Sequence, residues 1–263
     1  MRYGVCADPQ AAPTLAAAGF DFIELHVQNH LKTVEGDDAF QPALATIRAA
    51  PLPAPAANCF LPASLKVTGP VIDAAALEAY ALTSFARARA AGIRTIVFGS
   101  GGARRIPDGF DRGSAWKQLV WFGKLIAPLA QDQDVTVVVE PLNRARDECN
   151  VLNSIGECAR YVKAVNHPNL RLLADAYHWA LDNDSFGELV TNAHLLHHVH
   201  IATVPSRLPP GGEPCPALLS FFHALVLGGY DGPVSIESRW DDLPTQAPAA
   251  LAALVALVED ATL

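Results

Sequence analysis

The stretch Val135-Thr-Val-Val-Val-Glu140-Pro-Leu-Asn-Arg144 is a short apolar run that ends in a carboxylate. Its β-branched residues are typical of a strand buried in a parallel sheet. Further along, Ser154 precedes Glu157 by three residues, a capping-box pattern that predicts a helix over residues 154–165. Another apolar run, residues 170–174, follows this helix. Strand, helix and strand in this order predict one βαβ unit.

The same alternation extends in both directions along the 263 residues. Strand candidates are residues 3–6, 20–25, 56–60, 94–98, 135–139, 170–174, 197–201 and 234–236. Helix-like stretches between and after them include residues 74–91, 116–130, 154–165 and 246–258. Eight such repeats predict a single (β/α)8 barrel over residues 1–263, since this fold needs roughly 250 residues. An open doubly wound sheet is the alternative, but the glycine-rich fingerprint expected after its first strand is replaced by Cys6-Ala-Asp-Pro-Gln10.

Composition excludes several classes of protein. Hydrophobic residues make up 51% of the chain and charged residues 17%, which is too apolar for a disordered protein. No apolar run reaches the roughly 18 residues of a membrane span, and no signal-peptide pattern precedes the first strand, so we expect a cytoplasmic protein without a membrane partner. The net charge of −8 argues against a nucleic-acid partner. The five cysteines lack Cys-x-x-Cys spacing, which favours reduced thiols.

An acidic or histidine side chain stands at the end of each of the last four strand candidates. These residues are Glu140, Asp175, His200 and Glu237. Neighbouring parallel strands end at the same level about 5 Å apart, so the four side chains should converge at the barrel mouth. Three carboxylates so close together would repel one another strongly unless a cation lay among them. The pattern therefore predicts a divalent-metal site.

The ligand types narrow the choice of ion. Three oxygen ligands and one imidazole suit Mn2+, Mg2+ or Co2+ better than an ion that prefers sulfur. Mn2+ is the expected ion, and Zn2+ is an alternative that would favour tetrahedral closure. An octahedral ion with four protein ligands would leave two positions for adjacent oxygens of a hydroxy-ketone.

Taken together, Glu140-Pro-Leu-Asn-Arg144, Asp175-Ala-Tyr-His178, His200-Ile-Ala202 and Ile236-Glu237 resemble the xylose isomerase-like sugar isomerase/epimerase superfamily, and its ketose 3-epimerases in particular. The resemblance spans nearly the whole chain and implies a TIM barrel. It implies that the four strand-end residues bind the metal and that Glu140 and Glu237 also move the proton. It further implies that substrate is bound by His178, Arg207 and Glu148.

Two loops depart from the family pattern. Glu148 stands two residues later than its family counterpart, because Arg146 and Asp147 precede it. The loop over residues 203–212 is rich in proline and lacks the usual acidic residue. The sequence therefore leaves open which sugar is bound, whether it is phosphorylated, and whether the chain forms a homo-oligomer.

We therefore expect a divalent-metal-dependent isomerase or epimerase of a sugar, keto-sugar or related polyol, acting through an enediolate by carboxylate acid–base proton transfer. The alternative is a lyase or dehydratase that performs β-elimination, including C-glycoside cleavage, at the same site. Abasic-site endonucleases of this fold need three metals and a DNA-binding face, which the acidic balance disfavours. A sugar-binding subunit without catalysis would not require two positioned carboxylates.

Two smaller signals each have two interpretations. Glu24, in the second strand candidate, either supports the site or substrate or forms a structural ion pair. The glycine-rich loop over residues 99–110 either binds an anion through Arg104 or Arg105, or is a turn with solvated arginines. We favour the turn, because no helix N-terminus plainly completes a phosphate cradle.

Overall fold

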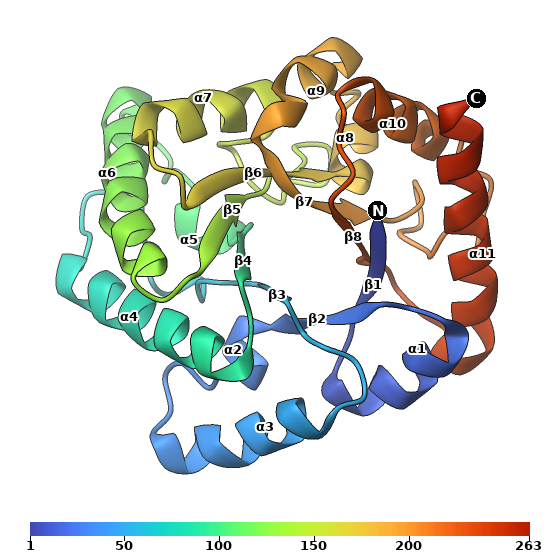
Figure 1. Cartoon of the computed structure of the whole chain (residues 1–263). Coiled ribbons are helices and arrows are strands. Elements are labelled where there is room, and N and C mark those ends of the chain that lie inside the picture. The colour runs from blue at the N-terminus through green and yellow to red at the C-terminus, as the bar shows by residue number, and fades with distance from the viewer.

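Eight parallel strands close into a barrel in the computed structural model, which describes residues 1–263 (Figure 1). Each strand pairs with the next one in sequence, and β8 pairs with β1. The strands are β1 (Arg2–Cys6), β2 (Phe22–His26), β3 (Ala56–Asn58), β4 (Thr95–Phe98), β5 (Thr136–Val139), β6 (Leu170–Asp175), β7 (Leu196–Ile201) and β8 (Pro233–Ile236). The predicted (β/α)8 barrel is confirmed, and every strand candidate overlaps a strand, although the bounds of most differ by one or two residues.

Helices surround the barrel (Figure 1). They are α1 (Ala12–Ala18), α2 (Val27–His30), α3 (Asp37–Ala49), α4 (Ala74–Ala91), α5 (Gly101–Arg104), α6 (Arg112–Gln131), α7 (Ile155–Val165), α8 (Ala176–Leu181), α9 (Phe186–Asn192), α10 (Pro216–Leu227) and α11 (Leu243–Thr262), with 3-10 turns at Pro9–Ala11 and Ala193–Leu195. The four predicted helices are present, and α6 and α11 extend beyond their predicted ends. None of the helices combines the length and apolar character that a membrane crossing requires.

Strand periodicity explains why the strand-end residues face the inside of the barrel. Val97, Val138 and Leu173 form a small apolar cluster that is separate from the main core between strands and helices. Side chains two residues apart on a strand point to the same face. Glu140 follows Val138 by two residues, and Asp175 follows Leu173 by two. The apolar cluster therefore lies inside the barrel beneath these carboxylates, which stand at the carboxyl ends of the strands.

Arg104 is fully buried, which corrects the interpretation of both loop arginines as solvated. Its guanidinium donates from Nη1 to the carbonyl of Phe98 at 2.9 Å and from Nη2 to the carbonyl of Glu140 at 2.7 Å. These carbonyls lie at the ends of β4 and β5, so Arg104 ties two strand ends together. Both of these donor atoms are therefore used within the protein, so Arg104 is not available to bind an anion. Arg105 is partly exposed, as expected, and pairs with Asp147 at 2.9 Å.

We expect Arg104→Met to lower the free energy of unfolding by about 3 kcal/mol or more, because buried carbonyls lose charged donors. Arg105→Met is the matched control in the adjacent residue, and its exposed ion pair should contribute less than about 1 kcal/mol. Urea denaturation of both variants measures the difference. Equal stabilities for the two variants would contradict the structural role of Arg104.

Candidate active site

The four predicted metal ligands lie together at the mouth of the barrel, and one donor atom from each lies within 4.8 Å of the others. Nδ1 of His200 lies 3.2 Å from Oε1 of Glu140, 3.7 Å from Oε2 of Glu237 and 4.0 Å from Oδ2 of Asp175. The imidazole nitrogen thus faces three carboxylates that come from three other strands. This is the convergence that the sequence pattern predicts.

Local backbone structure fixes two of these carboxylates. Asp175 is the N-cap of α8, and its Oδ1 accepts a hydrogen bond of 3.0 Å from the backbone N–H of His178. This bond leaves Oδ2 free to face His200. Glu140 lies against Gly99, where an added Cβ would stand only 2.2 Å from Oε2 of Glu140. A glycine at this position therefore makes room for the Glu140 carboxylate.

The three carboxylates of the ligand group outnumber the protein cations beside them, which are His200 and Arg207. Burial raises the pKa of the Glu237 carboxyl, and nearby Glu140 raises it further, while His200 and Arg207 oppose the change. Burial would lower the pKa of His200, but Glu24 and Glu237 raise it well above its ordinary value. Three carboxylate oxygens and one imidazole nitrogen form a donor set that fits Mn2+ or a similar divalent ion. These four residues could hold such an ion.

Binding of Mn2+ should weaken as the pH falls. The raised pKa of His200 means that Nδ1 of the metal-free protein carries a proton near neutral pH, and this proton must leave before Nδ1 can bind the ion. We expect the apparent affinity to fall about tenfold between about pH 6.5 and about pH 5.5, because one proton competes for the site. Calorimetric titration of Mn2+ across this range measures the slope. An affinity that does not change with pH would contradict this assignment.

A cavity of about 310 Å³ opens beside the ligand group, and the three predicted substrate-binding residues line it: His178, Arg207 and Glu148. Nδ1 of His178 accepts a hydrogen bond of 3.2 Å from the backbone N–H of Asn143. Because Nδ1 accepts, a neutral His178 carries its proton on Nε2. Nε2 lies 3.8 Å from Oε2 of Glu148. The later position of Glu148 in the sequence thus still brings its carboxylate into this cavity.

Arg207 lies over the ring of Tyr177, with its guanidinium carbon 4.7 Å from the ring centre. It donates a short hydrogen bond to Oε2 of Glu237 and lies 3.7 Å from Oε1 of Glu148. The cation–π contact and these two carboxylates restrict the guanidinium to one place. Arg207 therefore connects a predicted metal ligand to a predicted substrate contact.

Two further residues contact the site, and the sequence assigned neither of them an individual role. Asn58, at the end of β3, donates a hydrogen bond of 2.8 Å to Oε1 of Glu237. The side-chain amide of Asn143 lies 3.0 Å from Oε1 of Glu148 and 2.7 Å from Nδ1 of His178. Asn143 belongs to the motif that follows β5, and its spacing of three residues from Glu140 was the available signal. For Asn58 the signal was its place at a strand end, which is consistent with its position in the lining of the cavity.

Comparison with known proteins gives a consistent set of similarities. The family described as "Xylose isomerase-like TIM barrel" matches residues 13–257. A ketose 3-epimerase of Arthrobacter globiformis is 36% identical over 114 residues, which cover 43% of this chain and 38% of that protein. A putative hydroxypyruvate isomerase of Mus musculus is 29% identical over 143 residues, or 52% of each chain. The aligned part of the chain thus spans about half or less of these two relatives.

Solved structures show the same fold over nearly the full length. The crystal structure of D-psicose 3-epimerase with D-tagatose from Clostridium cellulolyticum H10 superposes with a TM-score of 0.84 at 21% sequence identity. The superposition covers 98% of this chain and 99% of that one. A D-allulose 3-epimerase from Methylomonas sp. superposes with a TM-score of 0.83 at 22% identity, covering 97% of this chain and 96% of that one. At these identities, the likeness is one of fold.

Proposed function

Because the chain belongs to the xylose isomerase-like TIM barrel family, we propose that it is a divalent-metal-dependent enzyme that epimerises or isomerises a neutral ketose through an enediolate. The observation that carries the proposal is the meeting of four donor side chains beside a cavity of sugar size. The similarity to ketose 3-epimerases supports the reaction class. Mn2+ suits the donor set, and Mg2+ or Co2+ would suit it as well.

When bound, such an ion supplies Lewis acidity that stabilises negative charge on a substrate carbonyl oxygen. Glu140 and Glu237 are the groups that remove and return the proton on the neighbouring carbon. They come from β5 and β8, three places apart in the ring, and so approach the cavity from different sides.

The other cavity residues hold these groups and the substrate in place. Asn58 and Arg207 each donate to one oxygen of Glu237 and so fix the orientation of its carboxylate. His178 offers Nε2–H to a substrate oxygen, and Glu148 offers acceptors for a substrate hydroxyl. Such hydrogen bonds discriminate a polyhydroxylated ligand from an apolar one.

The charge of the cavity favours a neutral substrate. Glu140, Glu148 and Glu237 line the cavity, with Asp175 beside them. The one lining arginine, Arg207, already pairs with two of these carboxylates. A bound divalent ion would still leave no excess of positive charge to receive a phosphate or carboxylate group. We therefore place a neutral ketose ahead of a sugar phosphate, and ahead of hydroxypyruvate despite the similarity to putative hydroxypyruvate isomerases.

The test is incubation of the Mn2+-loaded protein in D2O with D-fructose, D-psicose, D-tagatose or hydroxypyruvate, followed by NMR. We expect one of the ketoses to be converted, with one deuterium at the carbon that changes configuration. The chelator-treated protein is the control. Release of water from the sugar would instead support the lyase alternative, and turnover of hydroxypyruvate without turnover of any ketose would overturn the proposal.

A further inference from the structure

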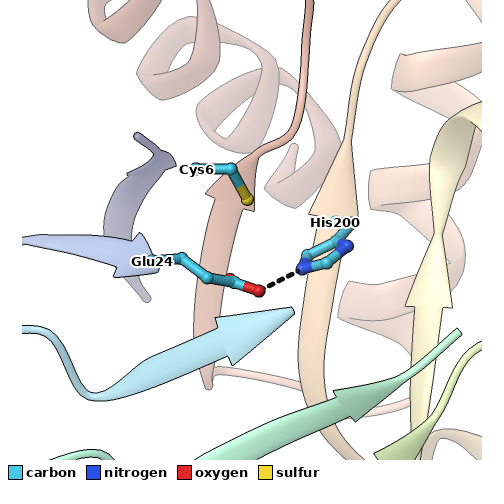
Figure 2. Close-up of side chains that lie close together, drawn as sticks. All are labelled: Cys6, Glu24 and His200. Carbon is cyan, nitrogen blue, oxygen red and sulfur yellow. Dashed lines mark hydrogen bonds and ion pairs between the residues drawn. The ribbon is translucent and has the colours of Figure 1, made fainter. Parts of the chain in front are cut away.

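Glu24 lies fully buried between two histidines inside the barrel. Its Oε1 is 2.9 Å from Nε2 of His200, and its Oε2 is 2.7 Å from Nε2 of His198. Figure 2 shows the contact with His200, which crosses from β2 toward β7. The hydroxyl of Ser235 also donates to Oε2, at 2.6 Å. Both carboxylate oxygens are therefore occupied by partners from β7 and β8.

His200 is held at both ring nitrogens. Nδ1 faces Glu140, Asp175 and Glu237, whereas Nε2 faces Glu24. A histidine that binds a metal through one nitrogen commonly donates the N–H of the other to a carboxylate, which fixes its tautomer and ring orientation. The arrangement around His200 has this geometry.

Cys6 also lies beside this pair, and Cys6, Glu24 and His200 offer donor atoms within 4.8 Å of one another (Figure 2). A second metal ion held by these three residues is therefore a competing interpretation. It would require Glu24 and His200 to give up their mutual contact. It would also take an oxygen of Glu24 away from the histidines and Ser235. The observed hydrogen bonds favour a supporting role for Glu24 over a second ion.

We propose that Glu24 is a positioning residue that keeps Nε2 of His200 protonated and Nδ1 directed at the metal position. His198 and Ser235 keep the Glu24 carboxylate in place. This inference rests on the proposed function, because it assigns Glu24 to the same metal site. Of the interpretations left open for Glu24, the contacts favour support of the metal site. Glu24 would act through His200 and not on the substrate.

The main test compares the Mn2+ affinity of the wild-type protein and Glu24→Gln by calorimetry. The amide keeps the shape of the side chain, but it removes the negative charge and leaves only one acceptor oxygen for His200 and His198. We expect the Kd to rise about 10- to 100-fold, as for other residues that support metal-binding histidines. Ser235→Ala should raise the Kd by roughly fivefold, since it removes one hydrogen bond from Glu24. Ser84→Ala is its matched control, because it removes a fully buried hydroxyl from α4 and should leave the Kd unchanged.

The visible absorption spectrum of the Co2+-loaded protein supplies a readout that a purely structural role would not change. It reports the ligands of the ion directly, so a misplaced His200 should alter the spectrum of Glu24→Gln. The outcome that overturns the proposal is wild-type affinity and spectrum in Glu24→Gln, or unchanged affinity in Ser235→Ala if Glu24→Gln does not fold. Binding of a second equivalent of metal that disappears in Cys6→Ser would also overturn it.

Failure of this inference can be separated from failure of the proposed function. If the wild-type protein binds Mn2+ and Glu24→Gln binds it weakly, the positioning role stands even if no ketose is converted. If ketose is converted and Glu24→Gln retains full affinity, the proposed function stands and the positioning role falls. If the wild-type protein binds no divalent ion, both fall.

Discussion

Glu140→Gln and Asp175→Asn should each weaken the binding of Mn2+ by on the order of 100- to 1000-fold. Each substitution removes a negative charge from a buried group in which one donor atom of every member lies within 4.8 Å of the others. Loss of one member of a buried charge pair costs about 3–5 kcal/mol, and the lower part of this range, about 3–4 kcal/mol, corresponds to the expected loss of affinity. Isothermal titration with Mn2+, together with metal content after dialysis, measures the effect.

Glu148→Gln is the control for these two variants. Glu148 lies in the same cavity and also carries a charge, but it stands outside the ligand group. Its replacement should change Mn2+ affinity much less than the other two substitutions. If both Glu140→Gln and Asp175→Asn kept tightly bound metal, the assignment of the four strand-end residues as ligands would be wrong.

Glu237→Gln should reduce kcat by about 10²- to 10⁴-fold, which is the usual contribution of a positioned acid–base group. The glutamine can still accept a hydrogen bond from Asn58, but it cannot take up and return a proton. Because Glu237 also belongs to the ligand group, turnover should be measured at a Mn2+ concentration that saturates the variant. Exchange of the substrate proton with D2O should fall in parallel with kcat.

Glu148→Gln again provides the comparison, because a residue that only binds substrate should affect KM more than kcat when it is replaced. Normal turnover and normal deuterium exchange in Glu237→Gln would contradict its acid–base role. Loss of activity that excess Mn2+ restores completely would show that Glu237 serves only to hold the ion.

The sequence alone was sufficient to predict the barrel and the meeting of four side chains at its mouth. The physical reason is that both depend on short-range regularities. Alternating strand and helix patterns predict the barrel, and period two places Glu140 on the same face as Val138. Once the strands are parallel and consecutive, residues at their carboxyl ends must approach one another. The ring order of the strands follows from the same repetition.

Only the tertiary structure shows the partners of Arg104 and Glu24. A glycine-rich loop gave no sign that Arg104 would fold inward onto the carbonyls of Phe98 and Glu140. Glu24 meets His200 across 176 positions of sequence, and a carboxylate in a strand has no local feature that selects such a partner. The cavity charge likewise depends on Arg207 reaching Glu148 and Glu237 from a loop. Spacing along the chain predicts which residues share an edge of the barrel, whereas packing in three dimensions decides which of them touch and which charges remain free.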